Sequence, residues 1–208
     1  MEVRAKRPAG ERTRAAILDK AVSLATVEGL EGLSIGTLAT ALDMSKSGLY
    51  AHFGSKQELL LATVEEAGRV FGAEVIEPAL AAPPGVAQLV AVCDAFFEHL
   101  ERRRFPGGCF FAGATLEMGA RPGPVNERIV AFQSSFTALV HQMVVRALEL
   151  GELPADEDAD QLTFELNGII LAANANFVLH QERPTLDLAR QVVARRLGVT
   201  RGSGTNVR

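Results

Sequence analysis

Apolar residues recur at intervals of three and four along most of this chain of 208 residues. In the first such segment, Ile17, Ala21, Leu24 and Ala25 share one face of a helix. No segment between turns alternates apolar and polar residues, as a half-buried strand would. The chain is therefore expected to be all-α.

Glycine, proline and capping serines divide this pattern into about nine helices. Gly29 ends the first helix, and Ser34, Ser45 and Ser55 are placed to cap the next three. Ser55 and Glu58 have the spacing of a capping box. The expected helices span residues 11–28, 35–42, 46–53, 56–76, 86–103, 110–119, 125–150, 156–180 and 184–197.

Composition narrows the class of protein further. The chain is 48% hydrophobic and 22% charged, which excludes a disordered or fibrous protein. Two cysteines, Cys93 and Cys109, are too few for a disulfide-stapled scaffold. Residues 1–14 lack the apolar core of a signal peptide, and residues 166–179 are too short and too rich in Asn to span a bilayer. A soluble, cytoplasmic protein is expected, with no membrane partner.

Charge is distributed unevenly along the chain, whose net charge is −4. Residues 1–14 hold five basic and two acidic groups, whereas residues 61–208 hold 13 basic and 18 acidic groups. A basic front on an acidic body favours an anionic partner at one end only. The alternative is that the basic front is a solvated tail.

Two short helices joined by a tight turn, after a longer first helix, match a helix-turn-helix unit. Leu38 and Leu42 are expected to face Leu49 and Phe53 across this unit. The outer face of the second short helix is polar or small, as a helix that reads base edges in the major groove requires. Its outer residues are Lys46, Ser47, Tyr50, Ala51 and His52.

At these residues the sequence resembles the TetR family of transcriptional regulators. The specific signature is Leu49-Tyr-Ala-His-Phe53 followed by Ser55-Lys-Gln-Glu-Leu59. Asp43 stands where the family often has glycine, and aspartate tolerates the left-handed conformation better than most residues. The resemblance implies an N-terminal three-helix helix-turn-helix DNA-binding domain (1–55), a helical ligand-binding and dimerisation domain (56–200) and a disordered tail (201–208).

The same resemblance implies a set of DNA contacts. Three of these residues have other possible roles: Tyr50 could cover apolar surface, His52 could cap the end of its helix, and Lys56 could be a solvated charge. The implied DNA-binding residues are Thr37, Lys46, Ser47, Gly48, Tyr50, His52 and Lys56.

The body contains the candidate ligand site. Eleven Phe against one Tyr and no Trp favour an apolar or aromatic ligand, although any single Phe could be ordinary core. One polar group of the ligand could be met by Glu117, His141 or Asn167. The candidate ligand-binding residues are Phe96, Phe97, Cys109, Phe110, Glu117, Phe132, Phe136, His141 and Asn167.

Cys109 follows Gly107-Gly108 and precedes a helix. A helix N-terminus lowers a thiol pKa, so Cys109 is a candidate reactive thiol, whereas burial would make it a small inert hydrophobe. Glu117 is either a partner of the ligand or a surface charge.

The last two helices are expected to form a homodimer interface. Ala172, Ala173 and Ala175 permit close helix approach, and reading a palindromic operator needs two reading heads. The alternative is that these helices only complete the core of one chain.

An enzyme is not expected, because the chain has no Gly-rich phosphate loop and no Gly-x-Ser-x-Gly motif. Glu98 and Glu101 flank His99 without metal-ligand spacing, so no metal and no cofactor are expected. The predicted function is a ligand-responsive DNA-binding repressor. Two alternatives remain: a redox or electrophile sensor that uses Cys109, and a helical dimer that acts through protein partners. Salt-dependent, specific DNA binding distinguishes the last of these.

Overall fold

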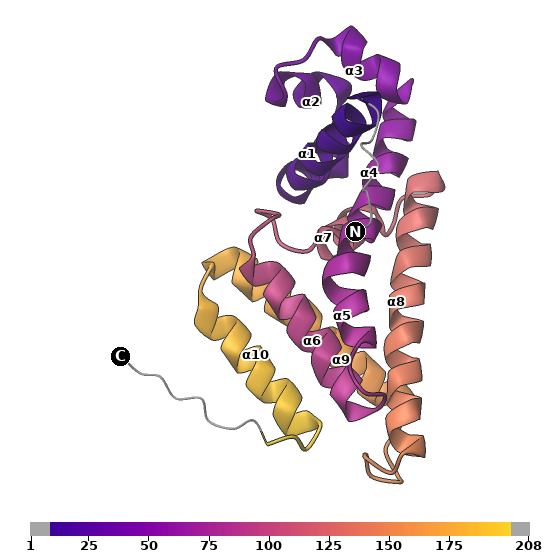
Figure 1. Cartoon of the computed structure of the whole chain (residues 1–208), viewed down its shortest axis with the longest axis vertical. Coiled ribbons are helices and arrows are strands. Elements are labelled where there is room, and N and C mark those ends of the chain that lie inside the picture. Colours follow the sequence, from indigo (N-terminus) through magenta and orange to yellow (C-terminus); the bar gives the residue numbers. More distant parts are fainter. Residues whose placement is uncertain (1–8, 201–208) are drawn as a thin grey trace, which may run out of the picture. The chain divides into compact units, whose positions relative to one another are not determined.

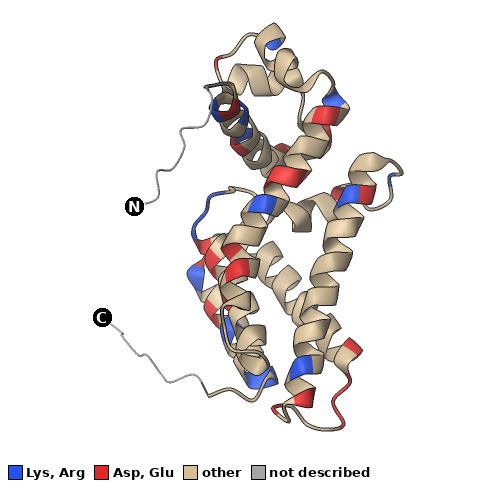
Figure 2. Cartoon of the chain, turned by 45° about the vertical axis from the view of Figure 1, so that its right-hand side comes forward, with Lys and Arg blue, Asp and Glu red and all other residues tan. Residues whose placement is uncertain are grey.

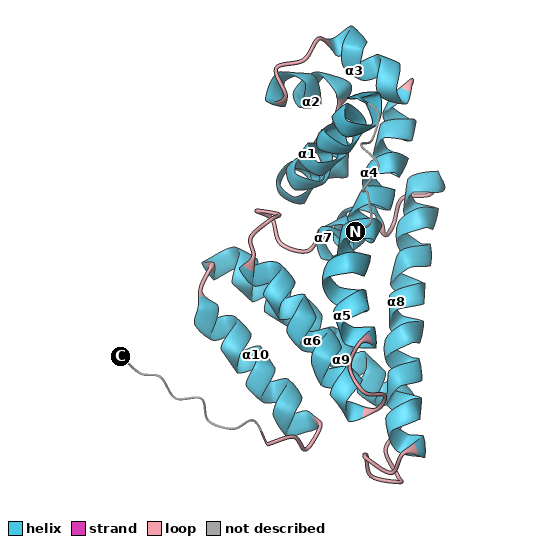
Figure 3. Ribbon diagram, viewed as in Figure 1, coloured by secondary structure: helices cyan, strands magenta, loops and turns pink. Residues whose placement is uncertain are grey.

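The computed structural model describes residues 9–200, and all regular structure in that range is helical (Figure 3). There are ten α-helices and one π-helical segment, with no strand among the described residues. Helix α4, the π-helical segment η1 and helix α5 follow one another directly (Figure 1). Residues 9–200 therefore contain nine separate helical stretches. The predicted all-α class is confirmed. Arg4, Lys6 and Arg7 of the basic front and the expected disordered tail, 201–208, lie outside the described residues.

Most helices begin and end within about four residues of the predicted positions. They are α1 (Ala9–Gly32), α2 (Ile35–Ala41), α3 (Lys46–Phe53), α4 (Lys56–Phe71), η1 (Gly72–Ile76), α5 (Glu77–Leu80), α6 (Val86–Glu101), α7 (Phe110–Met118), α8 (Pro124–Glu149), α9 (Ala159–His180) and α10 (Arg183–Arg196). Gly29 breaks α1 as predicted: its φ of 75° and ψ of 165° are non-helical, and a last helical turn follows it.

The helical stretch that starts at Lys56 does not end at Ile76 as expected. Its last part is the π-helical turn η1, and α5 follows immediately and continues to Leu80. Pro78 lies in the first turn of α5, a position where a missing N–H costs little. A proline near the end of a predicted helix therefore does not stop this one.

The described chain folds into two compact units that do not follow chain order. Unit 1 comprises the chain up to Val70 together with Phe105–Ala131, and unit 2 comprises Phe71–Arg104 together with the chain from Phe132 onward. Helices α1, α2, α3 and α7 lie in unit 1, while η1, α5, α6, α9 and α10 lie in unit 2. The sequence-based boundary between residues 55 and 56 concerns function, and it remains a prediction.

Buried apolar side chains hold α3 within unit 1. Helix α2 packs against both α1 and α3. Leu38 of α2 and Leu49 of α3 are fully buried, and Phe53 is nearly so. The Arg14 guanidinium lies 4.9 Å from the centre of the Phe53 ring, so α1 contributes a cation–π contact as well as apolar surface.

Helix α6 is central to unit 2, where it contacts η1, α5, α9 and α10 (Figure 1). Arg190 of α10 donates to Glu101 of α6 at 2.8 Å and lies 3.6 Å from Asp94 of the same helix. Its guanidinium also lies 5.6 Å from the centre of the buried Phe97 ring. These contacts attach α10 to α6 through charge and through aromatic packing.

Helix α9 is long and apolar enough to cross a membrane, judged by length and composition alone. This corrects the expectation that its apolar stretch is too short. One face of α9 is nevertheless buried inside unit 2, through Leu162, Leu166, Ile170 and Phe177. The core helix of a globular protein passes the same test, and 39% of the apolar window of α9 is buried.

Candidate DNA interface and ligand-binding residues

Serine side chains determine where α3 and α4 begin. Ser45 Oγ accepts a hydrogen bond from the Gly48 N–H at 3.0 Å, and Ser55 Oγ accepts one from the Glu58 N–H at 3.1 Å. Each serine satisfies a backbone donor that the first helical turn leaves unpaired. The start of both helices is thus encoded locally.

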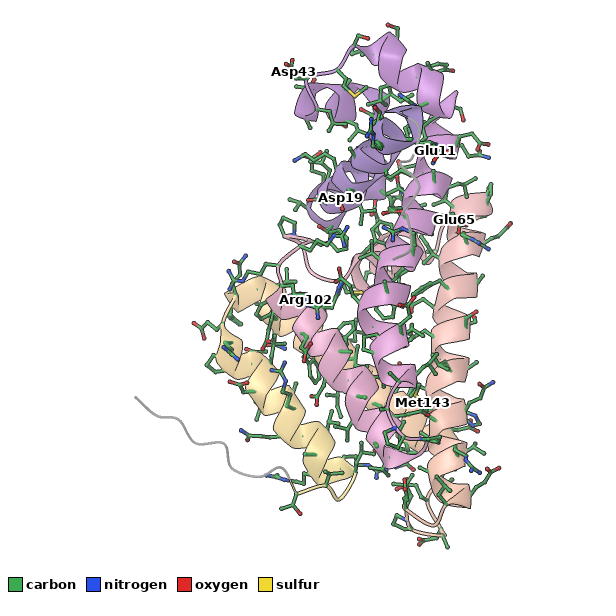
Figure 4. All side chains as sticks on the ribbon, viewed as in Figure 1. Glu11, Asp19, Asp43, Glu65, Arg102 and Met143 are labelled. Carbon is green, nitrogen blue, oxygen red and sulfur yellow. The ribbon has the colours of Figure 1, made fainter. Side chains whose placement is uncertain are left out.

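The turn between α2 and α3 places Asp43 in the left-handed region, with φ 52° (Figure 4). The Met44 N–H donates to the Ala39 carbonyl at 2.9 Å and closes the turn. The prediction that an aspartate can replace glycine at this position is confirmed, because aspartate is among the residues that tolerate this conformation.

Helix α3 has one buried and one exposed face. Leu49 and Phe53 are buried, while Lys46, Ser47 and Tyr50 are exposed, with 53% of Tyr50 accessible. Side chains one helical turn apart on the exposed face can reach a common groove. This face therefore presents an ammonium and two hydroxyl groups to a partner.

Gly48 and His52 are half-buried at the edge of that face. His52 lies in the last turn of α3, and its ring centre is 6.3 Å from that of Phe53. Its role at DNA stays a prediction, as does that of Gly48.

Thr37 is exposed, but its hydroxyl has local partners. Thr37 and Ser34 form a capping box at the start of α2, in which each side chain accepts the other's backbone N–H at 3.0 Å. A phosphate contact by Thr37 would therefore compete with the cap, or use its backbone.

Lys56, in the first turn of α4, is exposed and also has a protein partner. Its Nζ donates to the Glu31 carbonyl at the end of α1, at 3.0 Å. An ammonium has three N–H donors, so two remain for another acceptor such as a phosphate. The two roles considered for Lys56 from the sequence, a phosphate contact and a solvated charge, did not include this hydrogen bond to the Glu31 carbonyl.

Basic and acidic residues are interspersed along α1, as the blue and red segments of its ribbon in Figure 2 show. Glu11 and Asp19 share this helix with Arg12 and Arg14. Among the described residues, α1 therefore does not form a purely basic surface. The positive charge of the candidate DNA interface comes from Lys46 and Lys56.

The predicted ligand-binding residues fall into three groups within the two units. Four aromatic residues cluster in unit 2, two further residues line a groove of unit 2, and three residues belong to unit 1. The groups are Phe96, Phe97, Phe132 and Phe136; His141 and Asn167; and Cys109, Phe110 and Glu117.

Phe71 is the centre of the aromatic cluster, although it was not among the predicted site residues. Its ring centre lies 5.3 Å from those of Phe132 and Phe136 and 6.2 Å from that of Phe96, all in edge-on arrangements. Phe97 contacts Phe96 at 6.2 Å. Such edge-to-face contacts are favourable and form an apolar environment.

A polar group that the sequence did not predict lies beside this cluster. Glu74 Oε2 and the Nδ1 of buried His99 are 2.6 Å apart, and Arg104 donates to Glu74 Oε1 at 2.9 Å. Burial alone would raise the Glu74 pKa, but the hydrogen bonds with His99 and Arg104 outweigh it, so the pKa lies below its ordinary value.

The sequence pointed instead to Glu98 and Glu101 as the carboxylates beside His99. Glu98 pairs with Arg102, and Glu101 pairs with Arg190. Glu74 lies in η1, and no sequence signal announced a π-helical turn there. Among residues 9–200, no three His, Cys, Asp or Glu side chains gather as metal ligands.

Cys109 is buried at the start of α7. Burial raises its pKa to about 11, although the backbone N–H groups of Ala112 and Phe111 favour the thiolate. The sequence left two possibilities open for Cys109, a thiol activated by the helix N-terminus and a small buried hydrophobe. The raised pKa supports the second, because desolvation outweighs the effect of the helix N-terminus.

Glu117 lies in α7, but its side chain binds the end of α1. Its carboxylate accepts the backbone N–H groups of Leu30 at 2.8 Å and Glu31 at 2.9 Å, just after the break at Gly29. It is therefore neither a plain surface charge nor a group without a partner. Phe110, the next predicted residue of unit 1, packs edge-on against Phe111 at 5.2 Å.

His141 and Asn167 do come together, in an open groove of about 770 Å³ between α8 and α9. His141 Nε2 lies 3.3 Å from Asp160 Oδ1. Side chains of α8 and α9, among them the largely exposed Phe164 ring, form the remaining wall, whose surface is mostly apolar.

Two family models match the chain. Residues 17–63 match the bacterial regulatory proteins of the tetR family, and residues 85–193 match the tetracyclin repressor-like C-terminal domain. The second match alone spans more than half of the chain. The two matches together include residues of both units.

Individual proteins agree with these models. The HTH-type transcriptional regulator SrpR of Pseudomonas putida is 22% identical over 188 residues, covering 90% of this chain and 83% of SrpR. A TetR transcriptional regulator from Chloroflexus aurantiacus superposes with a TM-score of 0.82 at 24% identity, over 91% of this chain and 96% of that one. AibR in complex with isovaleryl coenzyme A and operator DNA gives 0.71 at 23% identity, over 86% and 95% of the two chains.

The signature at residues 49–59, the capped helices α2 and α3 and the matched C-terminal model all point to one family of regulators, which are not enzymes. The chain belongs to the TetR family of DNA-binding transcriptional regulators.

Proposed function

We propose that this protein is a homodimeric repressor that leaves a palindromic operator when a small apolar or aromatic molecule binds. The observation that carries the proposal is the exposed face of α3, with Lys46, Ser47 and Tyr50 held outward by buried Leu49 and Phe53. A helix anchored in this way can enter a major groove and present donors to base edges. Because operator DNA is intracellular, the proposal implies a cytoplasmic location.

Direct reading falls to Lys46, Ser47 and Tyr50, the exposed members of the predicted set. Gly48 would allow close approach to the groove, and Thr37, His52 and Lys56 would contact the backbone. Lys56 suits this role because two of its N–H groups remain after it binds the Glu31 carbonyl.

An exposed apolar stripe on α9 supports the dimer. Large side chains of the stripe are Phe164, 79% accessible, Leu171 and Leu179, all unusually exposed for their type. Small exposed residues lie between them at helical spacing, and α10 adds two exposed aliphatic residues. These small and aliphatic residues are Gly168, Ala172, Ala175, Leu188 and Val192.

Ala173 does not belong to this stripe, because it is buried within its own chain. The interface predicted from the alanines of α9 is thus narrowed to Ala172 and Ala175. A two-fold axis beside the stripe would bury the same surface of both copies, and two reading heads would then match half-sites roughly 34–36 Å apart.

The aromatic cluster around Phe71 supports an apolar or aromatic effector. Phe96, Phe132 and Phe136 offer ring edges and faces, and burying a charge among them without a partner would be costly. AibR, whose fold is similar, is recorded with both a small molecule and operator DNA. The effector would favour a conformation in which α4 has moved and the distance between the two reading heads no longer matches the half-sites of the operator. A coupling free energy of about 1–3 kcal/mol between the effector site and the DNA site suffices for this response.

Sensing by Cys109 is the less supported alternative. With its pKa raised to about 11, the thiol is almost entirely protonated at neutral pH, and the thiolate is the reactive form.

The test is to select bound duplexes from a random pool and to measure their affinity against salt. Lys46→Gln should change sequence preference, whereas Lys56→Gln should weaken all sequences alike and reduce the salt slope by about one unit. Arg146→Gln, an exposed cation of α8 in unit 2, is the matched control and should change neither. If no duplex is enriched, or if both lysine variants bind as the wild type does, the assigned DNA interface is wrong.

A further inference from the structure

Helix α2 contains a glycine that its backbone conformation does not require. Gly36 is the second residue of α2, and its φ lies outside the left-handed region that favours glycine. Glycine weakens a helix relative to alanine, because it loses more conformational freedom on folding. The reason for a glycine at this position therefore lies in what surrounds it.

The side chain of Lys46 occupies the space beside Gly36. A Cβ added at Gly36 would lie 3.6 Å from Lys46 Cε, 3.8 Å from Lys46 Nζ and 3.6 Å from the oxygen of the helix cap Ser34. Lys46 is the first residue of α3, so this contact joins the two helices of the helix-turn-helix. Gly36 is half-buried although the next residue, Thr37, is exposed.

This contact limits the directions that the Lys46 side chain can take. A free lysine side chain samples many rotamers, and contact between its methylene groups and other protein atoms favours a few of them. The rotamers favoured here place the ammonium on the side of α3 that faces α2. A side chain larger than a methyl group at position 36 would compete with the Lys46 methylenes for this space.

The Lys46 ammonium is available to DNA. Lys46 is exposed, and among residues 9–200 its Nζ makes no hydrogen bond or ion pair. All three N–H donors therefore remain for a partner, unlike those of Lys56, one of which binds the Glu31 carbonyl.

We propose that Gly36 sets the base preference of this protein by positioning the Lys46 ammonium. The proposal rests on the proposed function, in which Lys46 reads base edges in the major groove. A lysine ammonium donates to O6 and N7 of guanine, so one guanine of each half-site is expected to depend on both residues. Gly36 is a positioning residue, because it acts through Lys46 and carries no side chain that could read a base.

Two substitutions at position 36 separate contact from displacement. Gly36→Ala adds a methyl group at ordinary contact distance, so Lys46 should stay in place and the thermal midpoint should rise. Gly36→Val adds two stiffly held γ carbons, which should displace the Lys46 side chain without unfolding this half-buried position. The matched control is Gly113→Val, in α7, where an added Cβ meets nothing within 4 Å.

The positioning itself is tested without DNA, by NMR on the full chain with labelled glycine and lysine. In the wild type, the Hα protons of Gly36 should show nuclear Overhauser effects to the Hε protons of Lys46. The same contact should persist in Gly36→Ala and be lost in Gly36→Val. Absence of the contact in the wild type overturns the proposal.

The consequence for DNA is measured as the ratio of Kd between the selected operator and operators with one base pair changed at a time. Lys46→Met keeps the length of the side chain but removes the ammonium. Lys46→Met and Gly36→Val should each lose about tenfold in discrimination at the same base pair and retain the preference at the others. Gly36→Ala and Gly113→Val should keep the wild-type profile.

The double variant of Gly36→Val and Lys46→Met shows whether Gly36 acts through Lys46. Its loss should be no greater than that of either single variant, because both changes remove the same contact. Losses that add, losses at different base pairs, or a wild-type profile in Gly36→Val would each overturn the proposal. If no duplex is enriched from a random pool, the proposed function fails and the base preference with it, while the NMR contact still decides whether Gly36 positions Lys46.

Discussion

The Glu117 carboxylate and the backbone N–H of Leu30 are 2.8 Å apart, which joins α7 to the last turn of α1. Gly29 makes this approach possible, because a Cβ at Gly29 would lie 2.8 Å from both carboxylate oxygens. The carboxylate satisfies donors that the short helical turn after Gly29 leaves unpaired. A residue with the sequence context of a ligand contact is thus a helix cap that acts between two helices of unit 1.

Removal of this cap should destabilise the protein. Glu117→Ala leaves the N–H groups of Leu30 and Glu31 without their charged acceptor, and the free energy of unfolding should fall by about 1–3 kcal/mol. Urea unfolding measures the change. Leu116→Ala, at a neighbouring and largely exposed position, should stay within about 0.5 kcal/mol of the wild type. A Glu117→Ala protein as stable as the wild type would contradict the capping role and leave the predicted ligand contact as the role of Glu117.

Gly107 should not tolerate a side chain. Its N–H donates to Thr26 Oγ1 at 3.2 Å, and a Cβ at this position would overlap the Thr26 carbonyl oxygen. Gly107→Ala is expected to cost about 2 kcal/mol or more, since backbone has to move. The matched substitution Gly113→Ala, in α7, meets nothing within 4 Å and should stabilise by about 0.5–1 kcal/mol. Thermal unfolding of the two variants should therefore shift in opposite directions.

The lowered pKa of Glu74 predicts a contribution to stability that depends on pH. The folded pKa lies below the ordinary value of about 4.3, so the charged form contributes above that value and its contribution is lost as pH falls through the folded pKa. Glu74→Gln should cost about 1–3 kcal/mol at pH 7, and the difference from the wild type should shrink at acid pH. Urea unfolding from pH 7 downward measures this, with exposed Glu77→Gln as the control. A difference that does not change with pH would exclude the carboxylate as its source.

Cys109 should be unreactive in the folded protein. With a pKa of about 11, only about one thiol in ten thousand is ionised at pH 7, and its surroundings are closed to solvent. Alkylation by iodoacetamide, located by mass spectrometry, should be slow until denaturant is added. Rapid labelling of Cys109 at neutral pH, together with release of DNA, would instead support the thiol sensor.

Charge placed in the stripe on α9 should break the dimer. Leu171→Asp or Ala175→Glu would bury an unpaired carboxylate at the proposed two-fold interface, at a cost of several kcal/mol. Sedimentation should show monomers, and operator binding should be lost with them. Leu116→Asp, on α7, lies at a position more exposed than Leu171 and outside the stripe, and it should remain dimeric. Dimers that persist in both stripe variants would place the interface elsewhere.

The sequence alone determined the helices and the helix-turn-helix, because their signals are local. Ser45 and Ser55 begin helices through bonds to residues three positions on, Gly29 interrupts α1, and Asp43 adopts the conformation of the turn. Helical spacing likewise identified Leu49 and Phe53 as the buried side of α3. Each of these depends on a few neighbouring residues, so a single sequence is enough.

Only the tertiary structure decided which distant groups meet. Glu117 caps α1, Glu74 rather than Glu98 or Glu101 pairs with His99, and Lys56 binds the Glu31 carbonyl, all across long separations in the chain. The spacing of residues fixes the faces of one helix but not its rotation and depth against another. Burial also decided between the two states that the sequence left open for the Cys109 thiol, because desolvation depends on everything packed around the thiol and not on its place at a helix N-terminus.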